Sequence, residues 1–137
     1  MTDYLVDNSV WARLATGDQA ITARLRRVER APADLFVTCP PQVLEFCHSA
    51  RTPAEHARYR ELISLGFPLE RTPDESLVLD IQGALWKSGL VRAAGSLDIL
   101  IAGYAIENGA TVLTADQDFE HIAKVSELSH EYVGPQG

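Results

Sequence analysis

The sequence predicts an α/β domain with a mainly parallel central sheet. Short apolar runs, typical of buried strands, alternate along the chain with longer stretches in which apolar residues recur with helical spacing. Strands that are separated by helices favour parallel pairing, because parallel neighbours need a crossover connection. Hydrophobic residues make up 46% of the 137 residues, which is enough to build the core of one domain. We therefore expect a single domain over residues 1–137.

The first half of the chain begins with a strand and contains four helical segments. Ile21, Leu25 and Val28 recur at i, i+4 and i+7 and so share one helical face, and Asp18 precedes them as a fitting N-cap. Pro40 and Pro41 suit the first turn of a helix, and Pro53 marks a break before the next one. In chain order we expect strands at residues 4–7 and 35–38 and helices at residues 10–14, 18–30, 40–51 and 54–65.

The second half of the chain continues the same alternation. Gly66 is a candidate C′ residue for the helix before it, and Gly109 closes a strongly apolar helix. Leu77, Ile81 and Leu85 lie on one face of the helix between them. We expect strands at residues 67–70 and 111–113, an edge strand at 128–133, helices at 73–88, 96–108 and 118–125, and a loop at 89–95.

Charge, apolar runs and cysteine content limit the class of protein to which this chain can belong. Lys plus Arg is 12 and Asp plus Glu is 19, and a net charge of −7 argues against a polyanionic partner unless a metal site accounts for the excess acids. The chain has no signal peptide pattern and no apolar run of about 18 residues, so we expect a cytoplasmic protein. On one helix, Cys39 and Cys47 would lie roughly 12 Å apart, so we expect reduced, semi-buried thiols.

Four acidic residues lie in or beside apolar segments, far apart in the sequence: Asp7, Glu45, Asp98 and Asp116. Carboxylates are rarely buried without a partner, so four of them suggest one shared site. Asp7 and Asp116 each follow a predicted strand, which places both at the carboxyl edge of the sheet, where ligands bind. Protonation or a cation must relieve their repulsion, and hard oxygen ligands select Mg²⁺ or Mn²⁺.

Each of these acids taken alone also has a purely structural explanation. Asp7 is a possible N-cap, and Glu45 is a possible solvent-facing residue of its helix. Asp98 complements the dipole of the helix that it opens, where either Ser96 or Asp98 is a possible cap. Asp118 fits the N-cap of the following helix. Both interpretations stay open for each residue.

In combination these motifs resemble the PIN-domain family, and more closely its VapC-like toxin branch. The matching pieces are YLVDNSVW at residues 4–11, Glu45, DILIA at 98–102 and GATVLTADQDF at 109–119. The resemblance covers roughly residues 4–122, and order, spacing and flanking apolar residues all agree. It implies a PIN-like three-layer α/β/α fold.

The resemblance also implies an activity, which is metal-dependent endonucleolytic cleavage of RNA by the toxin of a VapBC-type toxin–antitoxin pair. Asp7 and Asp98 would be the main ligands of Mg²⁺ or Mn²⁺, and Asp116 would complete the site directly or through water. Glu45 would position a water or a second ion, and the four acids together would form the catalytic site. The expected partners are the RNA substrate, a VapB-like antitoxin and a second copy in a homodimer.

Other residues match the family motifs in supporting positions. Asp118 is a candidate auxiliary acid, and Ser9 and Thr114 match hydroxyl positions that support the site by hydrogen bonding. Asn8 occupies a place where relatives often have Thr or Ser. Gly103 falls where many relatives have Ala, which should affect helix stability more than chemistry.

A basic strip offers contacts to RNA. Arg24, Arg27 and Arg30 recur at i, i+3 and i+6 on the second predicted helix, and Arg51 lies further along. They are candidates for binding the phosphate backbone, and a solvated helix face with local ion pairs is at least as good an explanation for any one of them.

Two alternative functions remain at this stage. One is a catalytically silent PIN-like module that binds RNA or protein. The other is a receiver-type phosphoacceptor domain, which also uses strand-end acids with Mg²⁺. A receiver needs a late strand-end lysine, whereas Lys87 and Lys124 are both predicted on helices.

Overall fold

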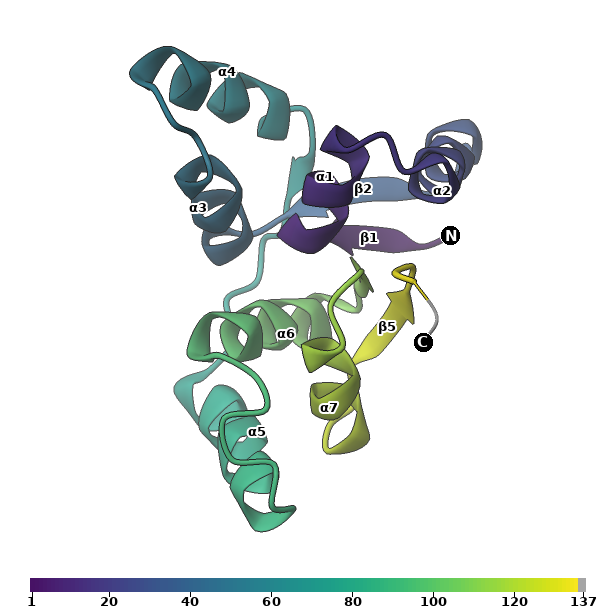
Figure 1. Ribbon diagram of the computed structural model, residues 1–137. Coiled ribbons are helices and arrows are strands. Elements are labelled where there is room, and N and C mark those ends of the chain that lie inside the picture. The colour runs from purple at the N-terminus through teal and green to yellow at the C-terminus, as the bar shows by residue number, and fades with distance from the viewer. Residues whose placement is uncertain (136–137) are drawn as a thin grey trace.

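The computed structural model describes residues 1–135 and contains a five-stranded parallel sheet in the order β3-β2-β1-β4-β5 (Figure 1). Its strands are β1 (Asp3–Val6), β2 (Leu35–Thr38), β3 (Phe67–Pro68), β4 (Thr111–Thr114) and β5 (Ser129–Tyr132). The helices are α1 (Asn8–Ala15), α2 (Gln19–Arg30), α3 (Pro40–His48), α4 (Pro53–Ile63), α5 (Glu75–Lys87), α6 (Ser96–Asn108) and α7 (Asp118–Lys124). The predicted α/β class and the order of its elements are confirmed.

Two apolar cores cover the two faces of the sheet and make the domain three-layered. Successive residues of a strand point to opposite faces, so Leu5 enters one core and Val6 the other, and Val112 and Leu113 separate in the same way. Helices α1 and α2 cover one face, and α5, α6 and α7 lie on the other (Figure 1). Helices α3 and α4 lie together beside α1.

The order of the strands creates a switch point between β1 and β4. From β1 the chain builds outward through β2 to β3, and it then returns to place β4 and β5 on the other side of β1. Val6 is in register with Leu113, and the Asp7 N–H donates to the Leu113 carbonyl at 2.9 Å. The carboxyl ends of these two strands therefore lie side by side, where open α/β sheets bind ligands.

Most predicted element boundaries differ from the observed ones by one to three residues. The helix expected over residues 40–51 ends at His48, because the Ser49 hydroxyl donates to the Phe46 carbonyl and Thr52 then caps the next helix. The strand expected over residues 67–70 has only two residues, Phe67–Pro68. Gly66 is not a C′ residue, because α4 already ends at Ile63. A Cβ at position 66 would lie 2.7 Å from a Thr38 methyl, so the close approach to β2 requires glycine.

Gly103 has a packing role that the sequence did not indicate. A Cβ there would lie 2.7 Å from Val78 Cγ1 and 3.2 Å from Pro73 Cβ, so this glycine lets α6 and α5 approach closely. Cys39 and Cys47 are both free, as predicted, but they are buried rather than semi-buried. Burial raises the pKa of the Cys39 thiol to about 11. No helix in residues 1–135 is both long and apolar enough to cross a bilayer.

Candidate active site

Asp7 is at once a helix cap and a buried carboxylate. It follows β1 with extended backbone and N-caps α1, and its Oδ2 accepts from the Ser9 N–H at 3.3 Å. The same oxygen accepts from the Ser9 hydroxyl at 2.6 Å and from the Thr114 hydroxyl at 3.2 Å. The residue is only 3% exposed. The cap explains the orientation of Asp7, and these three hydrogen bonds all go to one oxygen, Oδ2, of its carboxylate.

The two hydroxyls also hold the loop that follows β4. Ser9 Oγ accepts from the Ala115 N–H, and Thr114 Oγ1 accepts from the Asp116 N–H, both at 2.9 Å. Each hydroxyl therefore joins the Asp7 carboxylate to the backbone of the β4–α7 loop. This network places Asp116 beside Asp7, although more than a hundred residues separate them in the sequence.

Glu45 is brought to the same place by a side chain that the sequence analysis missed. Gln42 is 2% exposed, and its amide donates to the Val6 carbonyl at 2.6 Å and accepts from the Cys39 N–H at 3.2 Å. It therefore fixes the start of α3 to the end of β1, one residue before Asp7. Glu45 is partly exposed, and one of its carboxylate oxygens lies close to those of Asp7 and Asp98. A Gln three residues after an N-cap was the available signal.

Asp98 lies in the first turn of α6, where the helix dipole favours a carboxylate. The N-cap is Gly95 and makes no side-chain cap bond, so neither Ser96 nor Asp98 is the cap. Asp116 Oδ1 accepts from the Asp118 N–H at 3.0 Å. The N-cap of α7 is Gln117, so the expectation that Asp118 fills this position is wrong.

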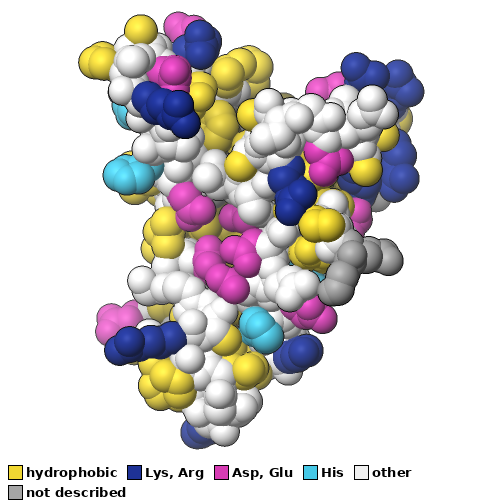
Figure 2. Space-filling view, viewed as in Figure 1, with side chains coloured by type: hydrophobic (Ala, Val, Ile, Leu, Met, Phe, Trp, Pro, Cys, Tyr) yellow, Lys and Arg dark blue, Asp and Glu magenta, His cyan; other side chains and the backbone are white. Residues whose placement is uncertain are grey.

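The five acids form two triads that share Asp98. Carboxylate oxygens of Asp7, Glu45 and Asp98 lie within 4.8 Å of one another, and so do those of Asp98, Asp116 and Asp118. Figure 2 shows acidic side chains gathered near the middle of one face of the molecule. Within residues 1–135 none of the five forms an ion pair. Their negative charge is therefore not balanced by basic side chains.

The pKa values of four of these acids are raised above their ordinary values. Burial, and then the charges of Asp7 and Glu45, raise the pKa of Asp98 to about 7. Burial also raises the pKa of Asp7, against the lowering effect of the Ser9 and Thr114 hydrogen bonds. The pKa of Glu45 is raised by burial and by Asp7, and that of Asp118 by burial and by Asp116. A donor set made only of carboxylate oxygens, short of positive charge, fits Mg²⁺ or Mn²⁺.

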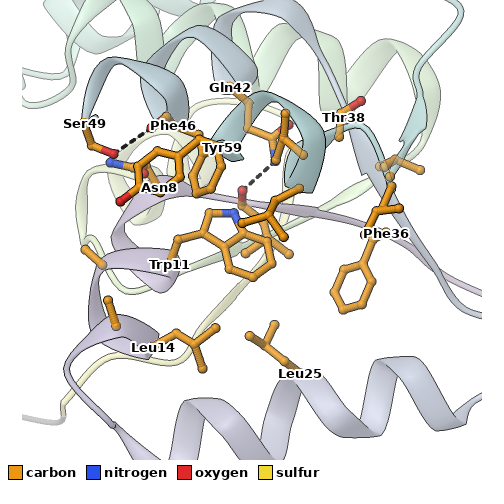
Figure 3. A pocket seen from close by; sticks show the side chains of 18 of the residues that line it. Asn8, Trp11, Leu14, Leu25, Phe36, Thr38, Gln42, Phe46, Ser49 and Tyr59 are labelled. Carbon is orange, nitrogen blue, oxygen red and sulfur yellow. Dashed lines mark hydrogen bonds between the residues drawn. The ribbon is translucent and has the colours of Figure 1, made fainter. Parts of the chain in front are cut away.

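A large apolar groove begins beside the acids, between α1 and α2 on one side and α3 and α4 on the other. Its volume is about 990 Å³, and Asn8, the residue after Asp7, lies on its wall. Figure 3 shows Trp11, Phe46 and Tyr59 close together there, with ring centroids 6.1 Å apart for Trp11–Phe46 and 5.1 Å for Phe46–Tyr59. We call this surface the aromatic groove.

The predicted basic strip is only partly available. Arg27 and Arg30 are exposed on α2, and Arg51 is exposed on the wall of the aromatic groove. Arg24 is different, because its guanidinium donates to both carboxylate oxygens of Glu131 and to the Tyr4 hydroxyl at 3.0 Å. These contacts raise its pKa, and its side chain is only 13% exposed. Of the two interpretations that the sequence left open, the local ion pair therefore describes Arg24.

Comparisons with known proteins agree with this geometry. The PIN domain family model matches residues 4–125. Ribonuclease VapC21 of Mycobacterium tuberculosis is 33% identical over 99% of this chain and 97% of its own length. A VapC ribonuclease of Mycobacterium bovis is 28% identical over 90% of this chain and 94% of its own length. The structure of VapBC-1 from nontypeable Haemophilus influenzae superposes with a TM-score of 0.72 at 21% identity, over 96% of this chain and 98% of that one.

The raised pKa of Asp98 predicts a pH dependence of stability in the metal-free protein. An unfolded chain releases this proton near pH 3.8, but the folded chain holds it until about pH 7. Asp98 therefore favours the folded state fully below its unfolded pKa, and this advantage is lost as the pH rises to about 7. Chemical unfolding at several pH values should show the wild type losing stability relative to Asp98→Asn over this range. A Glu61→Gln control should follow the wild type, and parallel curves for all three proteins would contradict the prediction.

The Gln42 contacts predict a stability cost that an exposed glutamine does not share. Gln42→Met leaves the Val6 carbonyl and the Cys39 N–H buried without partners, at about 1–3 kcal/mol for each unsatisfied group. Gln19→Met, on the exposed surface of α2, should change stability by less than about 0.5 kcal/mol. Urea unfolding monitored by circular dichroism measures both. Equal effects of the two substitutions would show that the Gln42 bonds do not fix α3.

Proposed function

The chain belongs to the PIN-domain family, and we propose that it is an endoribonuclease that requires Mg²⁺ or Mn²⁺ and acts as the toxin of a VapBC-type toxin–antitoxin pair. The observation that carries the proposal is the cluster of five carboxylates at the switch point of the sheet, without an ion pair among the described residues. The names of the VapC relatives support RNA as the substrate.

In this proposal the acids have different roles, which follow from their positions in the cluster. Asp7, Asp98 and Asp116 hold the ion, which when bound lowers the pKa of a water and offsets charge at the phosphate. Glu45, half-buried beside Asp7 and Asp98, accepts a hydrogen bond from the water and so orients that water toward phosphorus. Asp118 completes the second triad. Ser9 and Thr114 orient Asp7 and favour its ionised form by donating to its Oδ2.

The substrate has to approach a chain whose net charge is −7. We propose that exposed arginines guide the phosphate backbone, with Arg27 and Arg30 on α2 and Arg51 at the aromatic groove. Arg24 contributes less, because Glu131 already offsets its charge. Local basic residues offset the repulsion that the acidic chain as a whole exerts on RNA.

The two alternatives find less support. A receiver-type domain needs a lysine at a strand end, and Lys87 and Lys124 are instead the last residues of α5 and α7. A catalytically silent scaffold gains nothing from five acids held together at a cost in repulsion, since removing any one of them would relieve it.

The function is tested by cleavage of total cellular RNA by the purified chain, with Mg²⁺, with Mn²⁺ and with EDTA. We expect discrete, metal-dependent fragments, and we expect Asp98→Asn to lower the rate by about 100-fold or more, on the order of the loss of a metal ligand. Glu61→Gln, an exposed carboxylate on α4, is the matched control and should cut like the wild type. Circular dichroism verifies that each variant is folded.

The ends of the fragments test the chemistry separately. Attack by water leaves no 2′,3′-cyclic phosphate, and a 2′-O-methyl group at the cleavage site should not block the bond-breaking step. Cleavage that persists in EDTA or in Asp98→Asn would contradict the metal site. No cleavage of any RNA by the folded, metal-loaded wild type would favour the silent scaffold.

We also propose that a VapB-like antitoxin silences the chain by filling the aromatic groove and directing a basic side chain at the acids. The Haemophilus influenzae neighbour is a VapBC structure, which supports such a partner. The groove is apolar, it begins at Asn8 next to Asp7, and its wall contains Leu62, which is 52% exposed. An apolar segment of the antitoxin bound in the aromatic groove would therefore reach the edge of the acidic cluster.

The antitoxin prediction compares two exposed leucines. Leu62→Asp places a charge in the aromatic groove, whereas Leu44→Asp places one on α3 outside it. Using the partner that copurifies with the chain from its own operon, we expect Leu62→Asp to weaken inhibition of RNA cleavage tenfold or more and Leu44→Asp to leave it unchanged. Equal effects, or no copurifying protein, would contradict the proposed docking.

A further inference from the structure

One end of the aromatic groove lies beside the acidic cluster. Asn8 on one wall is the residue after Asp7, and Phe46 on the other wall is the residue after Glu45 (Figure 3). Whatever occupies this end of the groove is therefore a near neighbour of the carboxylates. If a phosphodiester bond is cut at the carboxylates, the nearest candidate for this space is a nucleotide that flanks that bond.

Three aromatic residues from three helices line this end of the groove. They are Trp11 of α1, Phe46 of α3 and Tyr59 of α4. Trp11 and Phe46 form a T-shaped pair with 61° between the ring planes, and Phe46 and Tyr59 form a tilted pair at 34°. All three residues are half-buried, so each keeps some exposed surface. Partly exposed aromatic rings are the surfaces on which unpaired bases stack in sites for single-stranded nucleic acid.

The indole N–H of Trp11 is a buried donor without an acceptor among residues 1–135. In Figure 3 this nitrogen lies on the edge of the ring that faces Gln42 and Tyr59. The Gln42 oxygen already accepts from the Cys39 N–H. An unpaired buried donor lowers stability, so this position favours a ligand that brings an acceptor. The edge of a nucleobase carries carbonyl oxygens and ring nitrogens that accept, whereas an apolar side chain offers none.

Helix α4 is the wall of the groove that can move to admit a base. It packs chiefly on α3, and none of its 11 residues is buried. A segment with few buried contacts opens with little loss of stability. The Tyr59 hydroxyl donates to Glu55 of the same helix at 3.3 Å, so the ring moves with the helix. Because the Trp11 N–H is covered in this structure, an acceptor reaches it when Tyr59 and α4 shift outward.

Arginines border the aromatic rings. Arg51 is exposed on the groove wall, and its guanidinium forms no ion pair within residues 1–135. The guanidinium carbon of Arg58 lies 5.9 Å from the centroid of the Tyr59 ring. Glu29 and Glu55 also line the groove, and Glu55 accepts from the Arg51 N–H and the Tyr59 hydroxyl. Aromatic rings next to arginines are the combination that binds the bases and phosphates of a single strand.

We propose that the end of the aromatic groove beside the acids is a nucleobase subsite, in which one unpaired base next to the scissile phosphate stacks on Tyr59 and accepts from the Trp11 N–H. Arg51 contacts a phosphate beside that base. The subsite rests on the proposed function, because it assigns a contact to the substrate of that reaction. The base has to be unpaired, since pairing and stacking in a duplex occupy its edge and its faces. The base and the proposed antitoxin segment would then exclude each other from this end of the groove.

Removal of single bases from a single-stranded RNA oligonucleotide tests the subsite. The oligonucleotide contains one bond that the wild type cuts, and an abasic residue replaces one nucleotide at a time on either side of it. We expect kcat/KM to fall tenfold or more at one flanking position and to change little at the others. Most of the change should be in KM, because the stacking contact is made in the ground state and the transition state alike. Equal losses at all positions, or no loss at any, would overturn the proposal.

Substitutions in the groove identify the residues that hold the base. Trp11→Leu and Tyr59→Ala should each lower kcat/KM about tenfold on the intact oligonucleotide and have little further effect once the sensitive base is absent. Trp11→Phe keeps a ring and loses only the N–H, so its loss should be smaller. Tyr59→Ala lies on a helix without buried residues and should keep the fold. Trp86→Leu, an exposed tryptophan on α5 outside the groove, is the matched control. Losses that are equal on the intact and the abasic oligonucleotides would contradict the subsite.

A binding measurement separates the subsite from the cleavage reaction. Asp98→Asn is mixed with single-stranded oligonucleotides of mixed sequence that carry the fluorescent base 2-aminopurine at one position each, and stacking on an aromatic ring quenches this base. We expect further quenching on binding at one position, and we expect the double variant with Tyr59→Ala to lose it. This readout remains if the wild type cuts no RNA, so failure of the proposed function does not hide the subsite. The absence of any quenched position would overturn the proposal.

The copurifying partner provides the last comparison. If Trp11→Leu and Tyr59→Ala weaken inhibition by this partner tenfold but cut the intact oligonucleotide as fast as the wild type, the groove binds the partner alone. That result would also overturn the nucleobase subsite, while it would leave the proposed antitoxin site in place.

Discussion

The pairing of β1 with β4 is the constraint on which the candidate site depends. It aligns Val6 with Leu113, so the strand ends that carry Asp7 and Thr114 lie next to each other. The hydroxyls of Ser9 and Thr114 then bond the Asp7 carboxylate to the loop of Asp116 across the whole length of the sequence. A slip of one residue in this register would reverse the faces of β4 and turn Thr114 away from Asp7. The sheet is thus a scaffold for the site as well as a core.

Electrostatic repulsion among the clustered acids lowers the stability of the folded state, and contacts elsewhere in the chain offset this loss of stability. Burial and repulsion raise the pKa of Asp98 to about 7, so the metal-free protein retains a proton where an isolated aspartate would have lost it. The dipole of α6 favours the Asp98 carboxylate, and Gln42 holds α3 and Glu45 against the end of β1. A divalent cation would replace the retained proton with two positive charges. The same arrangement that weakens the metal-free fold would therefore give the proposed site its affinity for a metal.

The sequence predicted the features that depend on local sequence patterns. Apolar spacing predicted every helix and strand in order, and the motifs around the four acids predicted which carboxylates come together. What it did not predict depends on contacts between distant segments. Gln42 bonds to a carbonyl of another strand, Arg24 pairs with an acid of β5, and Gly66 passes close to Thr38. The aromatic groove has no local signal either, because its walls come from four helices and two strands.

The strand order also divides the helices of the chain into two groups. Because β2 and β3 lie on one side of β1 and β4 and β5 on the other, α1 to α4 lie around one part of the sheet and α5 to α7 around the other (Figure 1). The acidic cluster lies where the two groups meet, since Glu45 comes from α3 and Asp98 from α6. The aromatic groove belongs to the first group alone. Substitutions in the groove can therefore change what binds there without moving α5, α6 or α7, whereas both groups must be in place to assemble the carboxylates.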